Sequence, residues 1–258
     1  MVYLSFRYRF SCLFLLLFTH LGSNFYLLAT VPEYTSQSLV AKQKEAIMRL
    51  YEQKRYTKAN EQIELLLPLL KNRTERSKFE LYQAYCNFYT KKYLVSAHQF
   101  HLFVKQYPTL PQVEEALFMK GYSLACENVD IRLDQTATYD AIRCLEHYLA
   151  IYPTGAYRNK ASDALQNLQA RLMQKNFQAA ALYVRLGYYN AAIVALTNFK
   201  QVYPDTPFKE QLLRLLIKCY EKLAMEASNP EKKQALKSCG YQFVQQLETY
   251  LNDTKAIR

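Results

Sequence analysis

The chain has 258 residues, half of them hydrophobic, including 23 Tyr and 14 Phe, and this composition excludes a chain that is disordered over most of its length. Gly is scarce, with five in the chain, which favours long helices joined by short turns over a sheet-rich fold. The formal net charge of +11 comes from basic residues that are scattered among Glu without a recognition motif, so we expect solvated helix faces and no nucleic-acid partner.

Residues 1–30 have the pattern of an export signal or membrane anchor. Arg7 and Arg9 precede an apolar run over residues 10–18, which is too short to span a bilayer alone. A cleaved or lipid-modified signal is the favoured interpretation, and an uncleaved anchor of about 20 residues is the alternative. A lipoprotein signal requires Cys after a small residue at the end of the apolar core, where this chain has Asn24.

Beyond this segment the sequence repeats. An aromatic residue or Thr is followed by a small residue at plus three, apolar residues at plus seven and plus ten, and Pro at plus fifteen. The three full matches are Tyr93, Ser96, Phe100, Phe103 and Pro108; Thr138, Ala141, Leu145, Tyr148 and Pro153; and Tyr189, Ala192, Leu196, Phe199 and Pro204. A fourth, with Lys71 in place of the Pro, is Tyr56, Ala59, Ile63 and Leu66.

Each position of the pattern has a physical role. The small residue lets two helices approach closely, the apolar residues form a buried stripe, and Pro ends the helix. The pattern is similar to the tetratricopeptide repeat, and a fifth hairpin without signature residues is expected over 212–250. The predicted fold is all-α, a tetratricopeptide-like helical-hairpin solenoid of about five repeats.

Two spacings depart from a plain array. Eight extra residues between Leu124 and Thr138 predict an elongated loop. The segment from Ala156 to Arg185 contains neither Gly nor Pro and predicts one long helix that joins the two halves. We therefore expect repeats 1–3 in residues 39–155, and the long helix with repeats 4–5 in residues 156–251.

Specific segments resemble the BamD (YfiO) family, the lipoprotein subunits of the machine that inserts β-barrel proteins into the bacterial outer membrane. These are Leu133-Asp-Gln-Thr-Ala-Thr-Tyr139, Leu182-Tyr-Val-Arg-Leu-Gly-Tyr-Tyr-Asn-Ala-Ala-Ile193 and Tyr203-Pro-Asp-Thr206. The sequence of the loop segment, residues 133–139, is most similar to that of family members from the Bacteroidetes. The resemblance covers roughly residues 41–250.

The resemblance implies a scaffold at the periplasmic face of the outer membrane, associated with the membrane through its amino terminus. It further implies binding to the barrel subunit BamA through the carboxy-terminal repeats, and to unfolded outer-membrane proteins through the amino-terminal repeats. Proteobacterial members commonly have Arg-Gly in the fourth repeat and a second Arg eight residues after that Gly. This chain has Leu186-Gly187 and Ala195 at these positions. Contacts made by those arginines are therefore not carried over.

Two sets of binding residues follow, each with a structural alternative. The expected substrate-peptide site consists of Lys78, Leu81, Tyr85, Phe88 and Tyr89, where the alternative is ordinary packing between helices. The expected BamA site consists of Asp134, Gln135, Thr136, Arg185, Tyr188 and Tyr189. There the alternatives are that Asp134 or Thr136 caps the following helix and that Tyr189 packs inside.

We expect no enzyme, cofactor or metal. Five Cys beyond the signal lack zinc spacing, and His98 and His101 lack a third ligand. A lytic transglycosylase would need a catalytic domain for which no residues remain. A periplasmic adaptor for cell-division or peptidoglycan proteins is the alternative function, although such proteins often carry a coiled coil, and no heptad run precedes Ala41.

Overall fold

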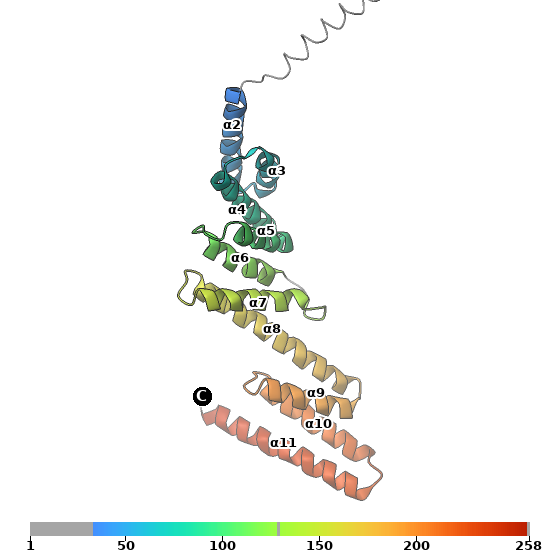
Figure 1. The fold of residues 1–258 in the computed structure, drawn as a ribbon. Coiled ribbons are helices and arrows are strands. Elements are labelled where there is room, and N and C mark those ends of the chain that lie inside the picture. Colours follow the sequence, from blue (N-terminus) through green and yellow to red (C-terminus); the bar gives the residue numbers. More distant parts are fainter. Residues whose placement is uncertain (1–32, 128–129, 257–258) are drawn as a thin grey trace, which may run out of the picture. The chain divides into compact units, whose positions relative to one another are not determined.

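The computed structural model describes residues 33–127 and 130–256, and all regular structure in these ranges is helical (Figure 1). Consecutive helices pair through short turns into hairpins, and the packed neighbours include α2 with α3, α4 with α5, α8 with α9, and α10 with α11. The predicted all-α array of about five tetratricopeptide-like hairpins is confirmed. The predicted export signal over 1–30 lies outside the described residues.

The chain divides into two compact units between Ala116 and Leu117. The first contains α2 (Glu33–Glu52), α3 (Tyr56–Leu66), the 3₁₀ turn η1 (Leu67–Leu69), α4 (Arg73–Tyr89), α5 (Tyr93–Gln106) and the start of α6 (Val113–Cys126). The second contains the rest of α6, α7 (Thr136–Ile151), α8 (Arg158–Arg185), α9 (Tyr189–Val202), α10 (Lys209–Glu226) and α11 (Pro230–Ala256). The grouping of repeats into 39–155 and 156–251 remains a proposal.

The repeat positions form the core of each unit. The small residues Ala59, Ser96, Ala141 and Ala192 are inaccessible to solvent. The apolar residues that follow them are at most 4% exposed: Ile63, Leu66, Phe100, Phe103, Leu145, Tyr148, Leu196 and Phe199. Burying one such side chain contributes about 1.5–3 kcal/mol, so these stripes supply much of the free energy that holds the hairpins together.

Helices α6 and α7 pack closely because a glycine lies at their contact. A Cβ placed on Gly121 would lie 3.0 Å from Cδ2 of Leu145 and 3.1 Å from Cβ of Cys144. Such distances are tighter than normal carbon contacts, so a larger residue would force the two helices apart. Close packing of α6 against α7 therefore requires Gly at position 121.

The Tyr-Pro pairs end the second helix of three hairpins. Helices α5, α7 and α9 stop one residue before Tyr107, Tyr152 and Tyr203, and each Tyr still donates its backbone N–H to the carbonyl four residues earlier. The following Pro has no N–H and cannot extend the ladder. It also restricts the preceding Tyr, whose backbone leaves the helical region.

Three hairpin turns share a left-handed residue two places before the residue that opens the second helix. These residues are Lys54, Lys91 and Gly187, with φ of 59°, 62° and 78°. In each turn the left-handed residue and the one after it donate N–H groups back to carbonyls of the preceding helix, as in a Schellman-type helix end. The turn geometry recurs even where Lys replaces the Gly that usually adopts it.

We expect Gly187→Ala to lower the free energy of unfolding by about 1 kcal/mol, because a side chain in the left-handed region is strained. Space is not the cause, since no atom lies within 4 Å of the added Cβ. Lys91→Gly is expected to act in the opposite direction, by about 0.5–1 kcal/mol. Urea denaturation followed by circular dichroism measures both, and shifts of the same sign would contradict the strain argument.

The long helix and the elongated loop predicted from the sequence are both present. Helix α8 runs for 28 residues and packs against α7, α9 and α10. The loop lies between Cys126 and Thr136, and the structure describes its residues 127 and 130–135. Both features belong to the second unit, where they build one of the surfaces described below.

The five cysteines in the described part of the chain differ in their exposure. Cys86 and Cys219 are buried, Cys126 and Cys144 are half-buried, and Cys239 is exposed, and all five are free thiols. Burial raises the pKa of the Cys86 thiol to about 12, which keeps it in the unreactive protonated form.

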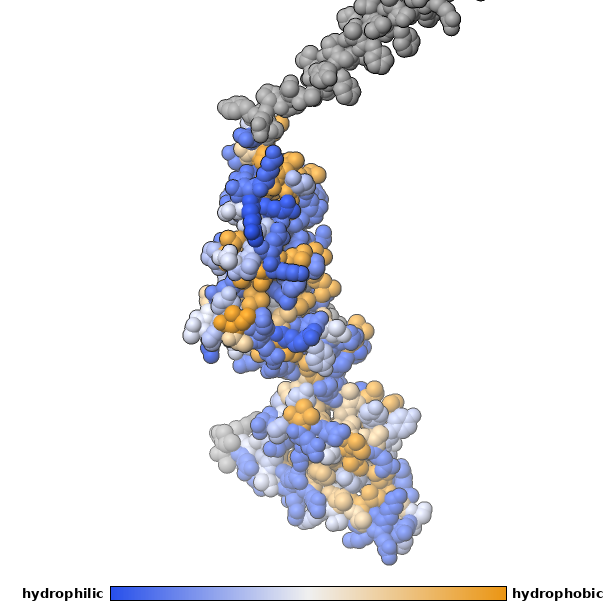
Figure 2. All heavy atoms as spheres, viewed as in Figure 1, coloured by the Kyte–Doolittle hydropathy of each residue, from blue (hydrophilic) through white to orange (hydrophobic). Residues whose placement is uncertain are grey.

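On the face seen in Figure 2, hydrophilic residues cover much of each unit and apolar residues form small patches between them.

Candidate protein-binding surfaces

The first unit contains a pocket of about 540 Å³ beside α4. We call it the aromatic pocket, and its lining residues are Tyr51, Thr74, Ser77, Lys78, Leu81, Tyr82, Tyr85, Phe103, Leu110, Pro111, Gln112 and Glu115. The six from α4 recur at spacings of three and four, so they lie on one face of that helix. A pocket of this size accommodates one or two large side chains of a peptide.

Helix α4 begins at a well-defined point, which fixes this face. The side chain of Asn72 accepts hydrogen bonds from the backbone N–H groups of Thr74 and Glu75, at 2.9 and 3.1 Å. Asn is among the strongest helix-capping residues because it satisfies donors that have no partner within the helix. The cap therefore sets where Lys78 and the residues after it stand along the pocket.

The aromatic pocket has apolar walls with one cation and one carboxylate. The hydroxyl of Tyr85 donates to the carboxylate of Glu115, and the Lys78 ammonium lies 5.9 Å from the ring centroid of Tyr82, within range of a cation–π interaction. Burial raises the pKa of Tyr51 above its ordinary value, so that wall is uncharged at neutral pH. The pocket can hold an apolar or aromatic side chain while Lys78 faces a carboxylate.

The five residues expected to bind substrate do not all reach this pocket. Lys78, Leu81 and Tyr85 line it, whereas Phe88 and Tyr89 do not. Tyr89 is 48% exposed, and its ring stacks on Tyr85 at 6.1 Å, so it extends the aromatic surface beyond the pocket. Phe88 is half-buried and meets Tyr93 edge-on, which is the packing role that the alternative interpretation gave it.

Aromatic rings continue from the pocket towards the turns of the first unit. Tyr89 stacks on Tyr56, with ring centroids 4.5 Å apart, and Tyr51 packs edge-on against both Tyr56 and Tyr82. Offset and edge-on pairs of this kind are worth about 0.5–1.5 kcal/mol beyond their buried area. The rings are therefore held in place before any ligand arrives.

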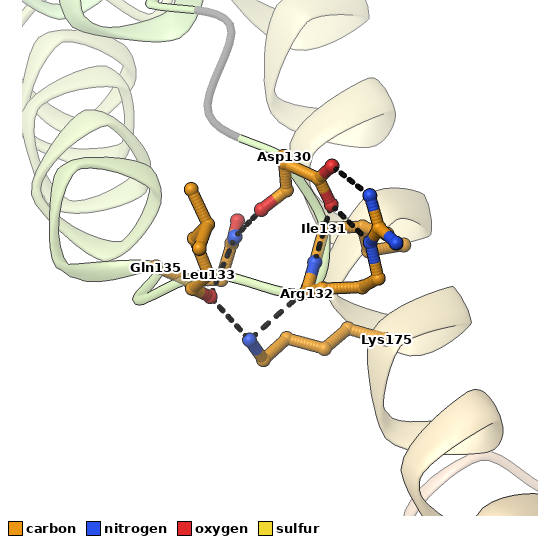
Figure 3. A network of polar contacts seen from close by, with 6 residues as sticks. All are labelled: Asp130, Ile131, Arg132, Leu133, Gln135 and Lys175. Atoms are coloured by element: carbon orange, nitrogen blue, oxygen red, sulfur yellow. Dashed lines mark hydrogen bonds and ion pairs between the residues drawn. The ribbon is translucent and has the colours of Figure 1, made fainter.

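In the second unit, the loop before α7 is fastened to α8 by one lysine (Figure 3). Lys175 donates from its ammonium to the backbone carbonyl of Ile131 at 3.1 Å and also to the carbonyl of Leu133. Because these residues are more than 40 positions apart in the chain, no sequence pattern indicates this contact. Lys175 thus fixes the loop against the middle of the long helix.

The loop is also held by an internal ion pair. Arg132 donates to both carboxylate oxygens of Asp130, at 3.1 and 2.8 Å, and this contact holds the pKa of Asp130 well below its ordinary value. A lowered pKa means that the contribution of the pair is present above the ordinary pKa and is lost as the pH falls below it. The pair is therefore maintained throughout the neutral and mildly acidic range.

The three loop residues expected to bind a partner have structural roles. Gln135 is 3% exposed, donates to the carbonyls of Asp130 and Leu133, and accepts from the hydroxyl of Thr138 at 2.8 Å. Asp134 accepts from the backbone N–H of Thr136 at 3.3 Å, at the start of α7. This agrees with the alternative that Asp134 holds the beginning of that helix.

The loop presents to solvent two of the three residues that the sequence indicated, Asp134 and Thr136, together with residues that it did not indicate. Leu133 is 60% exposed and Tyr139, at the start of α7, is 53% exposed. The side chain of Arg132 is 82% exposed. Asp130, Asp134 and Thr136 are exposed as well. We call Arg132, Leu133 and Tyr139 the loop surface. Their exposure depends on the local fold, so repeat patterns alone do not reveal it.

The turn between α8 and α9 carries the other residues expected to bind a partner. Tyr188 is 61% exposed, whereas Tyr189 is half-buried and packs against the core of this unit, as its repeat position indicated. Arg185 is exposed and lines a groove between α8 and α10. Tyr188 is accompanied by further exposed apolar residues of this segment, namely Leu182, Tyr183 and Leu186.

A family model described as YfiO, outer membrane lipoprotein, matches residues 41–236, a range that covers most of both units. The chain belongs to the YfiO family. The family resemblance drawn from the repeat spacing and the loop motif is therefore confirmed.

One relative and one solved structure are also similar to this chain. The outer membrane protein assembly factor BamD of Caulobacter vibrioides is 23% identical over 163 residues, which are 63% of this chain and 52% of that relative. The chain thus spans about half the length of that relative. The TPR2AB domain of yeast Sti1, in a complex with pHSP90, has a TM-score of 0.41 and 13% identity, covering 86% of this chain and 90% of that one.

Metal-binding groups and membrane-spanning helices were looked for in the described part of this YfiO family member. Among residues 33–127 and 130–256, no group of three or more His, Cys, Asp or Glu is placed to hold a metal ion. Within the same ranges, no helix is both long and apolar enough to cross a membrane.

Proposed function

We propose that this chain is a periplasm-facing scaffold subunit of the machinery that assembles outer-membrane proteins, acting by binding and not by catalysis. The observation that carries the proposal is the family match over residues 41–236, which includes most of both units. An assembly factor among its relatives supports the same role. The amino-terminal segment, 1–30, would hold the chain at the membrane.

The aromatic pocket is the proposed site for unfolded barrel substrates. Outer-membrane β-strands alternate apolar and polar residues and are flanked by aromatic girdles, so their unfolded segments carry aromatic side chains. Lys78 stands at the pocket to pair with a carboxylate, and Leu81 and Tyr85 offer apolar contact. Extended segments bound through a few large side chains fit the binding mode of such pockets.

The second unit is the proposed site for the barrel subunit, a BamA-like protein. The loop surface and the exposed Tyr188 provide apolar and aromatic groups of the kind enriched at the centres of protein interfaces. The loop takes its shape in part from Asp134, Gln135 and Thr136. Arg185 is the last residue of α8 and lies next to the turn that carries Tyr188. Tyr189 contributes by fixing the start of α9.

A native pull-down tests the proposal. The chain carries a carboxy-terminal tag, envelopes are solubilised in mild detergent, and co-eluting proteins are identified by mass spectrometry. We expect a BamA-like barrel protein in near-stoichiometric yield. Recovery of cell-division or peptidoglycan enzymes without such a protein would overturn the proposal in favour of a periplasmic adaptor.

Leu133→Asp is expected to reduce recovery of the barrel subunit at least fivefold, because it places a charge at the most exposed apolar position among the loop residues that the structure describes. Leu39→Asp serves as the matched control, since Leu39 is equally exposed, at 61%, but lies on α2. Equal loss in both variants would show that the effect is not specific to the loop surface.

A further inference from the structure

A groove in the second unit is lined by α8 and α10 and by no other element. Its lining residues are Phe177, Gln178, Ala181, Arg185, Gln211, Arg214, Leu215 and Lys218, and its volume is about 470 Å³. On each helix these positions recur at intervals of one, three or four, so each helix presents a single face. We call this feature the cationic groove.

The floor of the cationic groove is apolar and firmly held. Phe177 is 7% exposed and stacks on Phe208, with ring planes 4° apart and centroids 4.7 Å apart. Ala181 and Leu215 are half-buried beside it. A floor of this kind favours an apolar side chain of a ligand, because water there is replaced at little cost.

The rim carries three cations and no carboxylate among its lining residues. Arg214 is paired with Glu210 of its own helix, at 2.8 Å. Arg185 and Lys218 form no ion pair with any residue that the structure describes, although both are exposed. The groove therefore combines an apolar floor with positive charge that the chain itself leaves only partly balanced.

This combination selects among ligand classes. Nucleic acid is bound by cations that track a phosphate backbone together with exposed aromatic faces for stacking, but the one ring of this groove is almost fully buried. A metal cation is repelled by the rim. An acidic protein segment satisfies both features, since its carboxylates pair with Arg and Lys while an apolar side chain covers the floor.

We propose that the cationic groove binds an extended acidic segment of a protein, with carboxylates against Arg185 and Lys218 and one apolar side chain on Phe177, Ala181 and Leu215. Arg185 also borders the surface proposed for the barrel subunit. The groove proposal rests only on charge and shape, and it stands or falls separately from the pull-down.

Fluorescence anisotropy with labelled 12-residue peptides tests the groove, using the full-length chain in detergent. The probes are an acidic peptide with one central Leu, its amide analogue with Gln and Asn in place of the acids, and the acidic peptide with Ser in place of Leu. We expect the first to bind at least tenfold more tightly than the second and at least threefold more tightly than the third. Affinity is expected to fall as salt rises.

Variants locate the binding. The double variant Arg185→Glu, Lys218→Glu is expected to weaken the acidic peptide at least tenfold, and the milder Arg185→Gln, Lys218→Gln at least threefold. Lys222→Glu is the matched control, because Lys222 is exposed one helical turn further along α10 and outside the groove. Circular dichroism confirms that each variant is folded.

Three outcomes would overturn the groove proposal. The first is that the amide analogue binds as tightly as the acidic peptide. The second is that Lys222→Glu weakens binding as much as the double variant does. The third is that a single-stranded oligonucleotide binds more tightly than the acidic peptide. The pull-down has a separate readout, so loss of the barrel subunit and loss of peptide binding are distinguished.

Discussion

Replacing Phe100 with alanine is expected to lower the free energy of unfolding of the first unit by about 3–5 kcal/mol. Phe100 is fully buried on α5, at the plus-seven position of its repeat. Its ring also meets Tyr85 edge-on, with centroids 5.1 Å apart. The variant removes core contacts and leaves a cavity behind a wall of the aromatic pocket.

The measurement must report the first unit separately, because a chain with two compact units need not unfold in one step. Hydrogen exchange of the α4 and α5 amides provides this, with α10 and α11 as an internal reference. The control is Leu102→Ala on the same helix, which is 45% exposed and should cost about 1 kcal/mol or less. Equal protection in the two variants would contradict the assigned core.

Lys175→Met is expected to release the loop before α7 and to reduce recovery of the barrel subunit at least fivefold. The variant keeps the length of the side chain but removes the donor that reaches the carbonyls of Ile131 and Leu133. Hydrogen exchange should accelerate at loop amides such as that of Leu133, which bonds to the carbonyl of Asp130. The α9 and α10 amides should be unaffected.

Lys160→Met is the matched control, since Lys160 is exposed on the first turn of the same helix. It removes the same charge without touching the loop. If Lys175→Met frees the loop while recovery of the barrel subunit is unchanged, the loop surface is not the contact and the proposal for the second unit fails. If the loop amides exchange at the wild-type rate, Lys175 is not its anchor.

Much of the fold was predictable because it is governed by local rules. A Pro ends a helix wherever it stands, and residues at plus seven and plus ten share a face on any helix, so the ends of α5, α7 and α9 followed from spacing alone. The unbroken segment that became α8 followed from the absence of Gly and Pro. Such features need no knowledge of which helices meet.

The candidate surfaces were only partly predictable because they depend on contacts between distant residues. Lys78, Leu81 and Tyr85 share a helix face, and this was visible in the sequence. The opposite wall of the aromatic pocket, including Phe103 and Glu115, is brought there by folding. The sequence pattern places Gln135 among the binding residues, yet the loop closes around its amide and buries it.

Lys175 and Phe177 lie within a single turn of helix α8. Lys175 anchors the loop, and Phe177 forms part of the floor of the cationic groove. Two residues apart on a helix point in roughly opposite directions, so the loop and the groove lie on different sides of one stiff rod. A ligand that shifts this rod and the attached loop on entering the groove would change the affinity of the loop surface for its partner. Thermodynamic reciprocity then requires the partner to change the affinity of the groove by the same factor, which would make α8 the element that couples two binding events.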